Sequence, residues 1–128
     1  MSEYSPANKY RAKKVEIDGI IFDSGKEAEI YTDLKKQKAN GDIKDFAMQV
    51  TFELIPKQTE LTTVFDKKGL PKQKDKVVEN AVKYIADFVV YHHDGEVAIV
   101  DPKGKRTKDY VIKRKLMLFR HRIKIKEI

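Results

Sequence analysis

The stretch that decides the fold runs from Tyr84 to Lys105 and reads YIADFVVYHHDGEVAIVDPKGK. It contains two apolar runs, 82–91 and 96–101, which flank a turn with the dipeptide Asp94-Gly95. An Asp-Gly dipeptide between two apolar runs is a strong signal for a hairpin. Because both runs are nearly continuous in Val, Ile, Phe and Tyr, we expect two adjacent strands that are covered on both faces.

Each of these expected strands carries an acidic residue where burial makes a charge costly. Asp87 lies in the middle of the first strand, and Asp101 ends the second. Lys103 follows two residues later, so on a continuing strand it would share a face with Asp101. Taken alone, Asp101 and Lys103 favour an ion pair at a strand end. Together with Asp87, they point to a metal or a catalytic role.

The pattern of Asp87, thirteen intervening residues and then Asp101-Pro102-Lys103 resembles the signature of the PD-(D/E)XK nucleases. The wider chain is similar to a small phage-encoded family in that superfamily, related to Holliday-junction resolvases. The resemblance leaves out roughly residues 57–78 and is carried by the segments NKYRAKK, FDSGKEAE, YIADFVVY, VDPKGK and TKDYVIKRKL. Ala86 departs from the motif, which has Pro there. Pro102 lacks a strand donor, so the strand must end, bulge or lie at an edge.

This resemblance implies a Mg²⁺-dependent DNA endonuclease, for which Mn²⁺ would substitute. The implied catalytic residues are Asp87, Asp101, Lys103 and Glu27, and the implied metal ligands are Asp87, Asp101, Glu27 and the carbonyl of Pro102. Carboxylates with waters and substrate phosphates are the ligands that Mg²⁺ prefers. Lys103 would orient or activate the water, or stabilise developing negative charge.

Glu27 has a second, purely structural interpretation, because Ser24 with Glu27 three residues later forms a capping box at a helix start. In the expected helix, however, Glu27 shares the stripe of Ile30, Tyr31 and Leu34, which faces the core. Glu29 belongs to the polar side of the same helix. The metal role therefore favours Glu27, with Glu29 as the alternative.

Composition bounds the class of protein. The chain has 128 residues, 41% hydrophobic and 37% charged, so we expect one domain over 1–128 with the first eight residues flexible. It has no cysteine, which excludes disulfides and a thiolate zinc site. No apolar run approaches the roughly 20 residues that cross a bilayer. The expected location is the cytoplasm, that of a bacterial host cell if the chain is phage-encoded.

The net charge of +7 is concentrated near the C-terminus, since residues 103–126 hold eleven Lys or Arg and one acid. A basic block beside a candidate metal site favours DNA as the partner, although a solvated charged face is the common alternative. The residues that we expect to bind DNA are Lys105, Arg106, Lys113 and Arg114, with Lys9 and Arg11 in a basic N-terminal arm. By resemblance, Lys113 would also lie near the active site.

The remaining elements follow from turn and helix signals. We expect a short hairpin over 15–22, a helix over 24–40 and a strand over 43–55 that turns one face to the core, with Gln49 as an ordinary strand residue. Residues 57–76 predict a loop or hairpin tip, which is either a flap that contacts DNA or a disordered insertion. A helix over 108–120 should bury Ile112, Leu116 and Phe119, and an edge strand should follow over 123–126.

These elements predict an α/β fold with a restriction-endonuclease-like core, in which a mixed β-sheet is flanked by two main helices. The expected function is hydrolysis of phosphodiester bonds in DNA, with a preference for branched DNA that rests on the resemblance alone. Resolvases cut two symmetric strands as two-fold dimers, so a homodimer is the expected assembly. The alternative is a non-catalytic nucleic-acid-binding module that uses the basic face.

Overall fold

The computed structural model describes residues 13–102 and 106–128. Its two central strands are those of the apolar stretch that surrounds the Asp94-Gly95 turn. The elements in chain order are β1 (Val15–Ile17), β2 (Ile20–Phe22), α2 (Gly25–Ala39), β3 (Asp45–Ile55), β4 (Gln58–Phe65), β5 (Pro71–Glu79), β6 (Val82–Tyr91), β7 (Val97–Asp101), α3 (Lys108–His121) and β8 (Ile125–Glu127). The predictions for residues 1–8, Lys9, Arg11, Lys103 and Lys105 concern positions outside the described residues.

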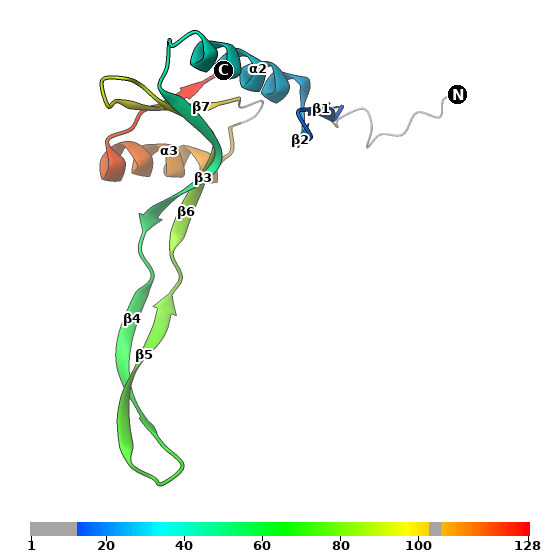
Figure 1. The fold of residues 1–128 in the computed structure, drawn as a ribbon. Coiled ribbons are helices and arrows are strands. Elements are labelled where there is room, and N and C mark those ends of the chain that lie inside the picture. The colour runs from blue at the N-terminus through cyan, green and yellow to red at the C-terminus, as the bar shows by residue number, and fades with distance from the viewer. Residues whose placement is uncertain (1–12, 103–105) are drawn as a thin grey trace.

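The main sheet has four strands in the order β3-β6-β7-β8. β3 and β7 pair with β6 in antiparallel fashion, whereas β8 is parallel to β7 at the sheet edge. The two helices lie on opposite faces of this sheet (Figure 1). The predicted class, an α/β domain with a mixed sheet flanked by two helices, is confirmed at this level.

Both faces of β6 and β7 are buried, which explains their continuous apolar sequence. Val89 and Ile99, each 0% exposed, pack in one cluster with Met117 of α3. Their neighbours Phe88 and Val90 pack in a second cluster with residues of α2. Successive residues of a strand point to opposite faces, so two helices are needed to cover one apolar run.

The helix starts follow the capping signals of the sequence. The Oγ of Ser24 accepts a hydrogen bond from the backbone N–H of Glu27 at 3.2 Å, and α2 begins at the next residue. Thr107 caps α3 in the same way, by accepting from the N–H of Tyr110 at 3.1 Å. The predicted helix starts are therefore confirmed.

The predicted buried stripe of α3 is wrong. Ile112 is 57% exposed and Phe119 is 76% exposed, whereas Tyr110 and Met117 are buried. Leu116 is only partly buried against the core. α3 carries apolar side chains around much of its circumference, so two stripes compete, and the stripe that starts at Tyr110 packs on the sheet.

Residues 57–76 do not form an irregular loop. They lie in an antiparallel hairpin of β4 and β5 whose turn is closed by Asp66 and Gly69. The hairpin continues β3 and β6 and projects away from the helices and the main sheet (Figure 1). We call residues 57–81 the arm. All nine residues of β5 are exposed.

No helix in the described part of the chain is long and apolar enough to span a bilayer.

Candidate active site

A row of polar residues crosses the main sheet at one level. In the β6–β7 ladder the last pair is Phe88 with Val100, so one further step sets Asp87 opposite Asp101. Asp101 in turn pairs with Glu127 of β8. On the other side of β6, Gln49 lies opposite Asp87, between two regular pairs of the β3–β6 ladder. We call Gln49, Asp87, Asp101 and Glu127 the polar row.

Gln49 is a site residue that the sequence interpretation as an ordinary strand residue missed. Its backbone φ is +54°, which is a left-handed conformation that residues other than glycine rarely adopt. Its Nε2 donates a hydrogen bond to Oδ1 of Asp87 at 3.2 Å. Strained backbone inside a strand is typical of functional sites.

At the distortion around Gln49, the side chains of β3 change the face of the sheet on which they pack. Met48 packs in the cluster of α2, but Val50 packs in the cluster of α3. β6 reverses at the same level, because Ala86 and Phe88 also belong to different clusters. The prediction that β3 turns one regular face to the core is therefore wrong, and the reversal is centred on Gln49 and Asp87.

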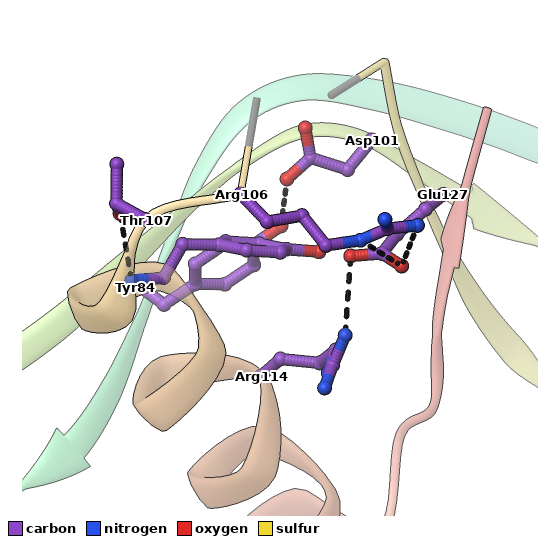
Figure 2. A network of polar contacts seen from close by, with 7 residues as sticks. Tyr84, Asp101, Arg106, Thr107, Arg114 and Glu127 are labelled. Atoms are coloured by element: carbon purple, nitrogen blue, oxygen red, sulfur yellow. Dashed lines mark hydrogen bonds and ion pairs between the residues drawn. The ribbon is translucent and has the colours of Figure 1, made fainter. Parts of the chain in front are cut away.

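Asp101 is fully buried at 0% exposure, the only charged residue so classed within the described ranges. The hydroxyl of Tyr84 donates a hydrogen bond to Oδ2 of Asp101 at 2.5 Å (Figure 2). Burial, followed by the bond to Asp101, raises the pKa of Tyr84 far above its usual range, so its hydroxyl keeps its proton. Tyr84 therefore acts as a fixed donor to this carboxyl group.

Glu27 approaches the polar row from the first turn of α2. Burial raises the pKa of its carboxyl group, and the charges of Asp87, Asp23 and Asp101 raise it further. The Glu27 side chain is half-buried, whereas Glu29 is exposed. Of the two candidates, Glu27 is thus the one whose pKa responds to the charges of both predicted ligands, Asp87 and Asp101.

A small cavity opens beside this cluster. Its volume is about 240 Å³, and it lies between β2, the start of α2, β3 and β6. Carboxylates of Asp23, Glu27 and Asp87 line it, together with the amide of Gln49. Two residues that the sequence assigns to a site, Glu27 and Asp87, therefore border one space, whereas Asp101 is not among the residues that line it.

The donor set suits a hard cation in its chemistry, because the contributed atoms are oxygens. In the conformation of the described residues, no three acidic or histidine side chains are grouped closely enough to hold a metal ion. Mg²⁺ needs only one or two carboxylates and retains several waters. Asp87 and Asp101 on adjacent strands meet that lower requirement.

Glu127, the last member of the polar row, forms ion pairs with two basic residues: Arg106, which precedes α3, and Arg114 of α3 (Figure 2). Arg106 contacts its carboxylate at 2.9 Å and Arg114 at 3.5 Å. Hydrogen bonds from Arg106 and then Tyr110 lower the pKa of Glu127 to about 2. Two of the predicted DNA-binding residues, Arg106 and Arg114, therefore have an internal partner, and their role in DNA binding stays a prediction.

Lys113 does not line the cavity that Glu27 and Asp87 border. It is half-buried and lines a cavity of about 540 Å³ beside the base of the arm, together with Tyr84 and Tyr110. Pro102 follows the end of β7 and is half-buried. The position of Pro102 agrees with the expectation that a strand lacking a donor there must stop.

Comparison with known proteins identifies a family. A family profile described as "Protein of unknown function (DUF1064)" matches residues 7–127, so the chain belongs to that family. No curated protein and no solved structure matches the chain.

Proposed function

We propose that this protein is a Mg²⁺-dependent DNA endonuclease of the PD-(D/E)XK type, and that its sheet and helices form a restriction-endonuclease-like core. The observation that carries the proposal is that three acids from three elements lie near enough for their charges to interact. The sheet register sets Asp87 opposite Asp101. Burial, and then the charges of neighbouring acids that include both, raise the pKa of Glu27.

Acids collected in this way favour a cation. Without one, burial and then the repulsion of neighbouring acids hold the pKa of Glu27 above its usual value. Asp87 and Asp101 would be the main ligands, with Glu27 and the carbonyl of Pro102 as the predicted remainder. When bound, Mg²⁺ supplies an activated water and positive charge for the transition state of phosphodiester hydrolysis.

The chain's own residues would position the ligands. Tyr84 fixes Oδ2 of Asp101 by donating a hydrogen bond, and Gln49 holds Oδ1 of Asp87 by a hydrogen bond from its amide. Lys103 is assigned by the sequence motif to orient the attacking water or to stabilise negative charge. Preference for branched DNA, and a two-fold dimer to cut it, remain part of the proposal from the motif resemblance.

A binding module without turnover is the second candidate. It is favoured by the complete burial of Asp101 and its bond to Tyr84, which is how a structural acid in a core is satisfied. In that case nucleic acid would bind on basic surfaces and the acids would serve stability alone.

Cleavage separates these candidates. Labelled four-way junction, linear duplex and single-stranded DNA are incubated with Mg²⁺, with Mn²⁺ and with chelator, beside Lys103→Ala and Asp87→Asn. Metal-dependent cutting that both variants lose is the expected result. Symmetric nicking of the junction alone would identify a resolvase, whereas cutting of all three substrates would keep the nuclease and remove the junction preference. Binding without any cutting would overturn the catalytic proposal in favour of the binding module.

A further inference from the structure

The arm presents two chemically different faces. In β5 the residues Lys72, Lys74 and Lys76 alternate with other residues, so all three point to one side. The register adds Val64, Thr62 and Glu60 of β4 to the same side. We call these six residues the lysine face. The opposite face holds Thr59, Leu61, Thr63, Phe65, Pro71, Gln73, Asp75 and Val77.

A side-chain contact supports this division. The Nε2 of Gln73 donates a hydrogen bond to Oγ1 of Thr63 at 3.2 Å, so these two residues share the face without lysines. Two of the arm's acids also lie away from the lysine face or are engaged in the turn. Asp75 pairs with Leu61 on the opposite face. Asp66 accepts hydrogen bonds from the N–H groups of Lys68 and Leu70.

The lysines of this face have no partner within the described chain. Lys72, Lys74 and Lys76 are exposed, and none forms an ion pair with any described acid. Five basic residues of the body, Lys35, Lys38, Arg106, Arg114 and Arg120, each contact a carboxylate, whereas other described body lysines, like those of the arm, form no ion pair with a described acid. The arm therefore carries three exposed lysines without an ion pair to a described acid at a distance from the core, and the only acid among the six residues of their face is Glu60, opposite Lys76.

We propose that the lysine face of the arm binds the phosphate backbone of duplex DNA, as a second contact surface outside the candidate active site. Residues two apart on a strand are about 6.8 Å apart. Consecutive phosphates of one DNA strand are separated by more than the axial rise of about 3.4 Å, because the backbone winds around the helix axis. Three lysines at this interval therefore match neighbouring phosphates of a single strand. The choice of DNA rests on the proposed nuclease function, whereas the polyanion chemistry rests on the arm alone.

The arm's reach extends the area over which DNA is held. Nine residues of β5 at about 3.3 Å each span about 30 Å, or about nine base pairs. Such contacts position the duplex without reading its sequence. This role also accounts for an exposed two-stranded hairpin, which is only marginally stable when nothing packs on it.

The test is DNA binding in chelator, where no cutting can occur, so its outcome is independent of catalysis. The triple variant Lys72→Gln, Lys74→Gln, Lys76→Gln is compared with wild type on a 30-base-pair duplex, by titration over a range of salt. Each lost phosphate contact lowers the salt slope by about 0.9, so a loss of at least about 2 is expected. If the two proteins bind equally at about 1 M salt, this difference in slope makes the variant bind roughly 100-fold more weakly than wild type at about 0.1 M salt.

Two matched variants separate a specific face from net charge. Replacing the same lysines by Arg should keep wild-type binding, since the charges stay in place. Adding Thr59→Lys, Leu61→Lys and Gln73→Lys to the triple Gln variant restores the net charge on the opposite face, and binding should stay weak. Thermal melting and sedimentation report the fold and the oligomeric state of each.

Four results would overturn the proposal. The first is absence of DNA binding by the wild type, and the second is wild-type affinity and salt slope in the triple Gln variant. The third is full recovery of binding in the variant with relocated lysines, which would reduce the effect to net charge. The fourth is a change of oligomeric state in the triple variant, which would assign the face to a second copy of the chain. If binding behaves as expected but no substrate is cut with Mg²⁺, the arm proposal stands and the nuclease proposal fails.

Discussion

The polar row and the arm use charge in opposite ways. In the row, acids are brought together in or beside the core, and each has a defined contact, such as Tyr84 with Asp101 or Arg106 with Glu127. On the arm, lysines stand exposed and without an acidic partner among the described residues. Burial, and then the charges of neighbouring acids, raise the pKa of Glu27 beside the row, and such a grouping of acids favours a cation, whereas exposed lysines favour a polyanion. Under the two proposals above, chemistry and substrate capture would occupy separate parts of one small chain.

The largest expected effect comes from removing a metal ligand of the row. Asp87→Asn should lower DNA cleavage by roughly 10²–10⁴-fold, because the amide cannot supply a carboxylate ligand or take part in activating water. DNA affinity in chelator should stay within about twofold of wild type, since the arm is unchanged. Single-turnover cleavage and a binding titration on the same preparation measure both. DNA cleavage at the wild-type rate by Asp87→Asn would contradict the proposal that the polar row carries out catalysis while the arm binds DNA.

Removal of the hydroxyl that holds Asp101 should cost stability. Tyr84→Phe loses the 2.5 Å hydrogen bond, so the free energy of unfolding should fall by about 1–3 kcal/mol. Tyr91→Phe is a matched control in the same strand, because its hydroxyl has no hydrogen bond to a described residue. Urea denaturation compares the two. Equal stabilities of both variants would contradict the assigned role of Tyr84.

The backbone at Gln49 gives a test of strain. Gln49→Gly and Gln49→Ala both lose the amide bond to Asp87, but only glycine adopts a φ of +54° easily. The glycine variant should therefore be more stable than the alanine variant by about 1 kcal/mol. At Thr51, which lies in the same strand and has no positive φ, the order should reverse. Chemical denaturation of the four proteins decides it, and the same order at both positions would argue against strain.

A smaller effect is expected at Glu27, and its sign depends on pH. The folded pKa is raised above the ordinary value of 4.5, so ionisation opposes folding. The cost is absent well below pH 4.5, grows as the pH rises from there to the folded pKa, and is constant above it. Without metal, Glu27→Gln should melt above wild type at pH 7 and equal it near pH 4. A variant less stable than wild type at pH 7 would show that Glu27 serves the fold alone.

The smallest expected effect concerns Glu127. Its folded pKa is lowered from 4.5 to about 2, first by Arg106. The stabilisation is therefore present above about pH 4.5 and is lost as the pH falls toward 2. Wild type should be more stable than Glu127→Gln at pH 7, and their urea midpoints should converge as the pH falls toward 2. A gap that does not change with pH would show that the side chain acts by packing.

Much of the fold could be predicted because strong local signals agree with the final contacts. Ser24, Thr107 and the Asp94-Gly95 turn each mark an element boundary that the structure keeps. The continuous apolar run of β6 predicted two covered faces, and two helices cover them. The stripe of α3 could not be chosen in this way, since apolar residues on several sides of the helix give no single phase.

The candidate site was predictable only in its acids. Asp87 and Asp101 stand out because charge interrupts apolar strands, and the helical phase selects Glu27 over Glu29. Gln49 and Glu127 join them through strand register, which is a long-range property that no local pattern reveals. The alternating lysines of β5 are visible in the sequence, but the prediction of a loop or hairpin tip over 57–76 did not include the two long paired strands that align them.

The central claim is that Asp87, Asp101 and Glu27 form one cation site. The most direct measurement is the melting temperature of wild type and of Asp87→Asn across a Mg²⁺ titration at pH 7, without DNA. A site that binds Mg²⁺ in the folded state alone should raise the wild-type melting temperature in proportion to the logarithm of Mg²⁺ concentration at saturation, and the variant should show no rise. Equal responses of the two proteins, or none in either, would contradict the account.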